Sequence, residues 1–291
     1  DLSIQQFLQE NDVPGIAGID TRALTKILRE KDTMNGMITT NEQYRLDDVL
    51  PRLEAYTTGR VVEKVTCKEK YEVKGAADLS ENGALSGSAK FVAEDYEAGV
   101  REGRPSLVRA LNGAGRRVAL LDLGTKDNIA CSLKMRGCDV TVYPASTPAS
   151  EIIASRPDGI MLSNGPGDPK ECTEIIREIR SLYESDVPIF AICLGHQLMA
   201  LAKGGKTYKL KYGHRGGNHP VKDLKTGRVY ISSQNHGYAV DAASMDPSVA
   251  REAFVNVNDG TNEGFAYEGK KIFTVQFHPE ACCGPQDSGY L

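Results

Sequence analysis

The second part of this 291-residue chain shows a regular alternation of apolar and mixed segments. Short apolar runs have the length of buried strands, and they lie at 118–121, 140–143, 159–162 and 189–192. The segments between them have the apolar spacing of helices, and these lie at 128–136, 152–155 and 174–183. Alternating strands and helices are typical of a parallel sheet with helices on both faces. The pattern therefore predicts an α/β fold from residue 116 onward.

The first part of the chain is less regular. Asp20 or Thr21 is expected to cap a helix. The apolar stripe of that helix consists of Leu24, Ile27 and Leu28. Strands are expected at 61–62 and 71–74, and the glycine-rich stretch 112–115 is expected to be a linker.

The end of the chain shows a third pattern. After Gly204 and Gly205, short segments favour β-structure, are expected to be antiparallel, and end in the strand-like run 272–277. The chain is therefore expected to form a smaller mixed α/β domain over 1–112 and a larger α/β domain over 116–291.

Cys193 stands where a predicted buried strand turns into a predicted helix. A helix N-terminus favours the thiolate, and parallel sheets place their sites at the carboxyl ends of strands. The run 272–277 delivers a second set of groups, His278 and Glu280, separated by Pro279. Pro279 favours an extended backbone at His278, so that Glu280 faces the same side and can hold the imidazole. This pattern predicts covalent catalysis with Cys193 as nucleophile, His278 as base and acid, and Glu280 as its orienting carboxylate.

Other positions are expected to shape a pocket around this thiol. The loop 164–169 places two glycines among prolines, which allows close approach of a ligand to the backbone. Gln197 lies one helical turn after Cys193 and can line the same pocket. The simpler alternatives are a stiff turn at 164–169 and an exposed polar side chain at Gln197.

Composition excludes several classes of function. The net charge of −4 argues against binding to nucleic acids or anionic membranes, and no apolar run is long enough to cross a membrane. Seven irregularly spaced cysteines do not form a disulfide framework, so we expect a reducing, cytoplasmic setting. No metal site is expected, because the histidine spacings match no zinc pattern; the histidines considered are His196, His214, His219 and His236.

Five blocks of sequence carry a family resemblance. Three resemble the signatures of class I, triad-type glutamine amidotransferases, and they are Ala191–Gln197, Ser163–Pro169 and Gln276–Glu280. The blocks 213–221 and 19–25 resemble the small, glutamine-hydrolysing subunits of carbamoyl-phosphate synthetases. The resemblance covers 13–40 and 117–287 and is weak over 41–110. It implies a flavodoxin-like amidotransferase domain preceded by a smaller, truncated N-terminal domain.

The resemblance also implies roles for residues of this sequence. Cys193 would attack the side-chain amide of L-glutamine, with release of ammonia and formation of a thioester. The backbone amides of Gly165 and Leu194 would form the oxyanion hole. The remaining substrate contacts that it implies are Gly167, Asn235, Gly237 and Tyr238. An ordinary turn is the simpler alternative for 235–238.

A partner follows from the same resemblance. The large synthetase chain would receive ammonia by an enclosed route and make carbamoyl phosphate for arginine and pyrimidine biosynthesis. ATP and Mg²⁺ are expected on that large chain. No cofactor is expected in the present chain, because no Gly-Lys-Ser/Thr sequence follows 165–167 at the spacing of a P-loop.

Three alternatives remain open at this point. The chain could serve another synthetase, such as that for anthranilate or GMP, although the block 19–25 argues against this. It could be a non-catalytic scaffold of the same fold, although intact Cys193, His278 and Glu280 argue against that. A cysteine hydrolase of γ-glutamyl peptides would act without any partner.

Overall fold

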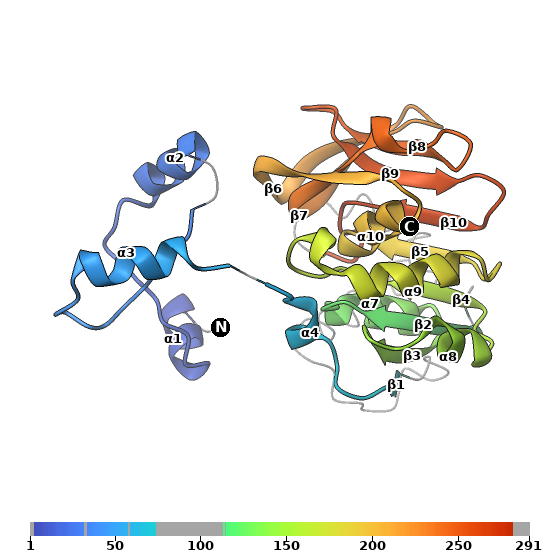
Figure 1. Ribbon diagram of the computed structural model, residues 1–291, viewed down its shortest axis with the longest axis horizontal. Helices are drawn as coiled ribbons and strands as arrows, with labels where there is room; N and C mark the ends of the chain where they lie inside the picture. Colours follow the sequence, from blue (N-terminus) through green and yellow to red (C-terminus); the bar gives the residue numbers. More distant parts are fainter. Residues whose placement is uncertain (1–2, 32–33, 58, 74–112, 114, 282–291) are drawn as a thin grey trace, which may run out of the picture. The chain divides into compact units, whose positions relative to one another are not determined.

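The computed structural model describes residues 3–31, 34–57, 59–73, 113 and 115–281. The chain divides into two compact units, Asp1–Thr58 and Gly59–Leu291 (Figure 1). This division lies earlier than the predicted boundary at 112–116, because the segment that follows Gly59 joins the second unit. The predicted linker lies only partly within the described residues.

The first unit is helical in its described part. Its helices are α1 (Ile4–Glu10), α2 (Thr21–Lys31) and α3 (Leu46–Glu54). The Asp20 carboxylate accepts a hydrogen bond of 2.9 Å from the backbone N–H of Ala23, so Asp20 caps α2 as one of the two predicted candidates. None of the three helices contains a buried residue.

A ten-stranded sheet forms the second unit, in the order β1-β3-β2-β4-β5-β10-β9-β8-β6-β7. Its parallel part consists of β3 (Asp139–Pro144), β2 (Arg117–Asp122), β4 (Gly159–Leu162), β5 (Ile189–Ile192) and β10 (Ile272–Val275). The four strands predicted before Cys193 are therefore confirmed. At one edge, β1 (Tyr71–Val73) pairs antiparallel with β3, which confirms the strand predicted at 71–74.

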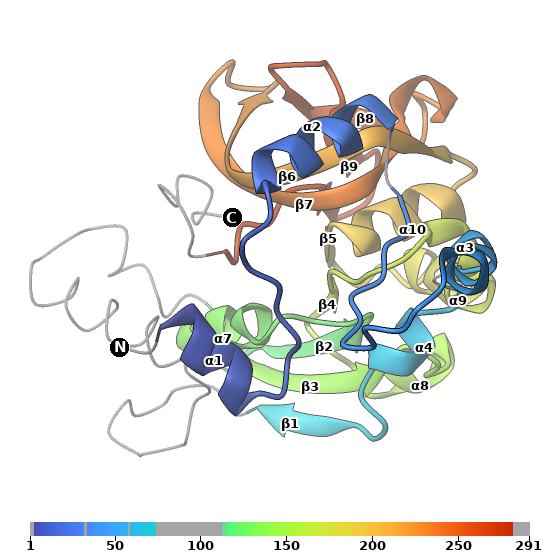
Figure 2. The ribbon, with the colours of Figure 1, turned by 90° about the vertical axis from the view of Figure 1, so that its left-hand side faces the viewer.

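Helices cover both faces of the parallel part. They are α7 (Asp127–Met135), α8 (Ala149–Ala154), α9 (Thr173–Tyr183) and α10 (Leu194–Ala202). Figure 2 shows α7 on one side of the strands and α8, α9 and α10 on the other. The strand pleat explains this, because alternate side chains point to opposite faces. In β2, Leu121 packs into the core under α8, α9 and α10, whereas Leu120 packs into the core under α7.

The antiparallel part extends the sheet beyond β10. It consists of β9 (Asn262–Tyr267), β8 (Ala250–Asn256), β6 (Lys206–Asp223) and β7 (Val229–Asp241). The antiparallel arrangement was predicted, but β6 and β7 are longer than the short segments expected, with 18 and 13 residues. They bend through two register shifts, at Lys209/His214 and at Gly216/His219.

One predicted strand is wrong. Val62 begins the short helix α4 (Val62–Val65), and Val61 precedes it in a helical conformation. Val62 is buried in the core under α8 and α9. Packing of this side chain therefore decides the local structure, and the β preference of two consecutive valines is overridden.

Candidate active site

Cys193 lies at a strained turn between β5 and α10. Its φ of 53° and ψ of −102° place it in a region that side chains other than glycine rarely adopt. Its backbone N–H donates to the carbonyl of Val275 in β10, at 2.8 Å. The turn also requires Gly195, because an added Cβ would stand 2.6 Å from the carbonyl oxygen of Leu162. The fold therefore holds the thiol at the carboxyl edge of the sheet, at the start of α10.

His278 and Glu280 form a buried pair beside this thiol. His278 Nδ1 and Glu280 Oε1 are 2.7 Å apart, and each side chain is only 3% exposed. The backbone N–H of His278 donates to the carbonyl of Ser233 at 2.9 Å, which attaches the segment after β10 to β7. As predicted, residues two apart face the same side, so the Glu280 carboxylate reaches a ring nitrogen of His278, which is Nδ1.

The charge state of this pair follows from its surroundings. Burial acts to lower the pKa of His278, but Cys193 and the Glu280 carboxylate act in the opposite direction and raise that pKa to about 10. Burial likewise acts to raise the pKa of Glu280, and the His278 hydrogen bond, with Lys126 nearby, holds it below its usual value. Cys193 contributes to the raised pKa of His278 both through its charge and through a side-chain hydrogen bond.

Lys126 is a further cation at this pair. Its Nζ lies 3.7 Å from Glu280 Oε1 and 3.5 Å from His278 Nδ1. Asn164 holds the turn that carries it, since Asn164 Oδ1 accepts from the Lys126 backbone N–H at 3.1 Å. Lys126 was not predicted as a site residue, and Asn164 was predicted only as part of the pocket loop 164–169, although both follow buried strands at the predicted edge of the sheet.

These groups open into one cavity of about 500 Å³. Its lining includes Cys193, His278 and Lys126, together with three of the predicted substrate contacts. Those three are Gly165, Asn235 and Gly237. The cavity is also lined by Arg215 and His236, which were not predicted to line a pocket. Burial lowers the pKa of His236 to about 3, so this imidazole is neutral.

Gly165 has a position that only glycine can occupy. An added Cβ would overlap the carbonyl oxygen of Leu123 and stand 2.7 Å from Leu194 Cδ2. Leu194 is the first residue of α10, where a backbone N–H has no acceptor within the helix. Gly165 and the start of α10 are therefore packed together beside Cys193.

Four predicted contacts lie outside the lining of this cavity, namely Leu194, described above, and Gly167, Gln197 and Tyr238. Gly167 has a φ of 95° and lines a neighbouring cavity of about 370 Å³. Gln197 is buried, and its Nε2 donates to the carbonyl of Tyr238 at 2.7 Å and to Gln276 Oε1 at 2.9 Å. Burial raises the pKa of the Tyr238 hydroxyl, and the nearby carboxylate of Asp168 raises it further. Gln197 therefore supports the wall that carries Tyr238.

Known protein families match the two parts of the chain. The family "Glutamine amidotransferase class-I" matches residues 119–291, and "Carbamoyl-phosphate synthase small chain, CPSase domain" matches residues 1–38. The carbamoyl phosphate synthase small chain of Clostridium perfringens is 43% identical over all of this chain and 71% of its own length. This chain belongs to the carbamoyl phosphate synthase small chains. The small chain of Symbiobacterium thermophilum is also 43% identical, over 99% of this chain and 71% of its own length.

A solved structure supports the fold of this small chain. It is that of a putative GMP synthase component from Thermoplasma acidophilum, and the match covers 60% of this chain and 89% of the other. The TM-score is 0.53 and the sequence identity is 20%. The predicted family and the predicted amidotransferase fold are confirmed. Among the described residues, no helix is both long and apolar enough to cross a membrane.

Proposed function

We propose that this small chain hydrolyses L-glutamine at Cys193 and delivers the ammonia to a large synthetase chain. Membership in the family gives it the role of the glutaminase component of carbamoyl phosphate synthesis. The observation that carries the proposal is the strained Cys193 in one cavity with His278, whose imidazolium is supported by Glu280.

The first half of the reaction releases ammonia. The Cys193 thiolate attacks the carbon of the side-chain amide, and the carbonyl oxygen becomes an oxyanion. We assign the stabilisation of this oxyanion to the N–H groups of Leu194 and Gly165, which flank the thiol. The His278 imidazolium then gives its proton to the departing nitrogen, the C–N bond breaks, and a thioester and ammonia remain.

The second half regenerates the thiolate. Neutral His278 takes a proton from water, the resulting hydroxide attacks the thioester, and the C–S bond breaks to release glutamate. Glu280 holds the His278 ring in one orientation during both halves of the reaction, because its carboxylate accepts the Nδ1 hydrogen at 2.7 Å. No step requires a cofactor in this chain, and we assign ATP and Mg²⁺ to the large chain.

Substrate recognition is assigned to the opposite wall of the cavity. Asn235 and Gly237 border it from β7 and are proposed to bind the α-amino and α-carboxyl groups of glutamine, with Tyr238 behind them. Gly167, which follows Pro166, is proposed to contribute to glutamine binding through its backbone. Gln197 is proposed to act by positioning Tyr238, through the 2.7 Å hydrogen bond to its carbonyl.

The test is release of glutamate from glutamine, with and without a carbamoyl phosphate synthase large chain. We expect release that increases with the partner and disappears in Cys193→Ala. Release that is indifferent to the partner would instead favour a free-standing hydrolase. The absence of release from folded protein in every mixture would favour a non-catalytic scaffold.

A further inference from the structure

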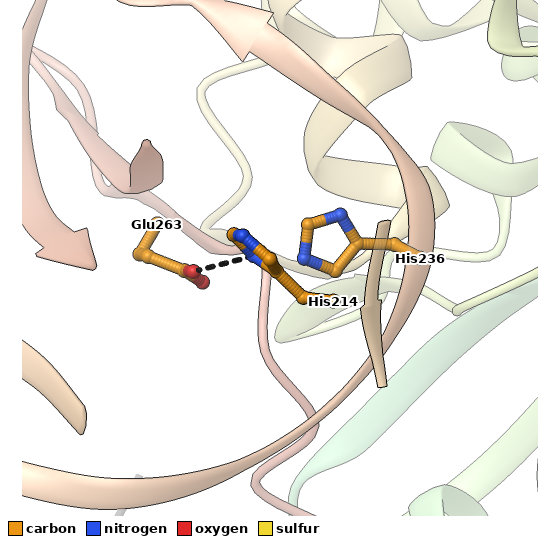
Figure 3. A group of neighbouring side chains, drawn as sticks. All are labelled: His214, His236 and Glu263. Atoms are coloured by element: carbon orange, nitrogen blue, oxygen red, sulfur yellow. Dashed lines mark ion pairs between the residues drawn. The ribbon is translucent and has the colours of Figure 1, made fainter. Parts of the chain in front are cut away.

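Three buried side chains from three strands meet next to the glutamine cavity. His214 in β6 stands directly opposite His236 in β7 in the antiparallel ladder, and Glu263 comes from β9. Their exposed fractions are 7%, 6% and 0%. In Figure 3 the Glu263 carboxylate and a ring nitrogen of His236 both face the His214 ring.

Each imidazole is oriented by a partner on its far side. His236 Nδ1 lies 2.8 Å from the carbonyl oxygen of Tyr238, which can only accept, so Nδ1 carries the hydrogen. In this neutral ring Nε2 holds a lone pair, and no described atom hydrogen-bonds to it. His214 Nε2 lies 2.7 Å from Asp259 Oδ2 and donates to that carboxylate, which leaves His214 Nδ1 directed at the other two groups.

The carboxylate is held in the same way. Glu263 Oε2 accepts a hydrogen bond of 2.8 Å from Gln234 Nε2, and Oε1 accepts one of 3.0 Å from Asn256 Nδ2. Partners of this kind, which fix ring tautomers and carboxylate orientation from outside, are those that surround metal ligands in proteins. The three groups are therefore fixed before any ligand binds.

Protonation of His214 alone does not give each of the three groups a hydrogen-bond partner. His214 Nδ1 and Glu263 Oε1 are 3.6 Å apart, too far for a hydrogen bond, and Nδ1 has no other partner among the described atoms. A proton on Nδ1 would make only this long ion pair with Glu263 and would leave the lone pair of His236 Nε2 without a donor, and a bare Nδ1 would be one more lone pair facing two others. A cation at the centre would satisfy all three.

We propose that His214 Nδ1, His236 Nε2 and Glu263 Oε1 form a binding site for one divalent ion of the zinc type. One possible ligand atom from each of the three residues lies within 4.8 Å of the other two. Ligands at about 2.0–2.2 Å from zinc in a tetrahedron stand roughly 3.4 Å apart, so small side-chain movements would complete the site. Two imidazoles and a carboxylate are a ligand set that zinc accepts, with the fourth position open to water.

Binding here would act on the wall of the glutamine cavity. His236 lines that cavity between Asn235 and Gly237, which also line it. An ion that fixes His236 would therefore fix the backbone of both neighbours. This consequence rests on the proposed function, whereas the binding of the ion does not.

The experiment is titration of the reduced, EDTA-treated full chain with Co²⁺, followed by visible absorption and by metal analysis after gel filtration. Glu263→Gln and His236→Asn each remove one ligand. His219→Gln is the matched control, because its ring lies 5.2 Å from that of His214 but outside the three-atom set. Circular dichroism and thermal melting establish that each variant is folded.

We expect one Co²⁺ per chain with the intense visible bands of tetrahedral cobalt, retained in His219→Gln and at least about tenfold weaker in both ligand variants. Zinc should displace the cobalt and bleach the bands. The proposal is overturned if the wild type binds no stoichiometric metal, if both ligand variants bind as well as the control, or if thiolate-to-cobalt charge-transfer bands show that cysteines are the ligands. Should Glu263→Gln fail to fold, anomalous scattering from zinc in wild-type crystals decides the same question.

Discussion

Gly165→Ala offers a sharp test of the proposed oxyanion hole. The added methyl group would overlap the carbonyl oxygen of Leu123 and stand 2.7 Å from Leu194 Cδ2, both inside the 3.0 Å limit that real Cβ contacts respect. The nearest obstacle is backbone at the end of β2, which cannot rotate away. The Gly165 backbone, and its N–H with it, must therefore shift away from Leu123 and Leu194 and leave its present position.

The expected loss follows from the value of one oxyanion-hole donor, about 2.7–4 kcal/mol, or roughly 100–1,000-fold in kcat. Overpacking should also lower stability by about 1–3 kcal/mol. Turnover of glutamine and thermal melting separate the two effects. Labelling of Cys193 by an electrophilic glutamine analogue establishes that the thiol remains accessible.

Gly159→Ala is the matched control. It lies at the start of β4, the strand that precedes Gly165, and its added Cβ would meet only the carbonyl oxygen of Pro188, at an ordinary 3.7 Å. We expect nearly unchanged turnover from this variant. If Gly165→Ala kept its kcat within threefold of the wild type, the assignment of the Gly165 amide to the oxyanion hole would be refuted.

Three further predictions concern the triad. Cys193→Ala should reduce glutamate release to background without loss of the fold, and residual release in a folded sample would place the nucleophile elsewhere. Glu280→Gln removes a charge-assisted hydrogen bond worth about 1.5–3 kcal/mol, so kcat/KM should fall by about 10–150-fold; a change below twofold would show that the carboxylate is dispensable. Because the pKa of His278 is raised to about 10 from an unfolded value of about 6.5, its contribution to stability is complete below pH ~6.5 and is lost as the pH rises toward 10. Melting temperatures should therefore decline over that window more steeply for the wild type than for His278→Asn, and parallel curves would contradict this origin of the shift.

The parallel part of the fold could be predicted from sequence because its signals are local. Strands such as β4 and β5 are short apolar runs between turn signals, and the structure reproduces their predicted limits. The turn at Cys193 and the spacing of His278 and Glu280 depend on neighbouring residues only. The arrangement of the proposed triad, with Cys193 and His278 in one cavity, was predicted from these signals together with the rule that parallel strands end at one edge.

Other features depend on contacts distant in sequence. Val62 forms a helix because it packs into a core built by later strands and helices. The function of Gln197 as a support for Tyr238 depends on a strand about 40 residues later, which no helical spacing shows. Glu263 was not predicted beside His214 and His236, because the strand that carries it, β9, comes later in the chain and is placed by the order of the sheet.

The position of β10 in the sheet affects when the nascent chain can complete its fold during synthesis on the ribosome. This strand lies between β5 and β9, parallel to the first and antiparallel to the second, yet it is the last strand described in the chain. Until it is synthesised, the two parts of the sheet have no strand to join them and Cys193 has no His278. A nascent chain can thus fold its early βα units while it remains unable to release ammonia, and activity begins only when the final strand enters the middle of the sheet.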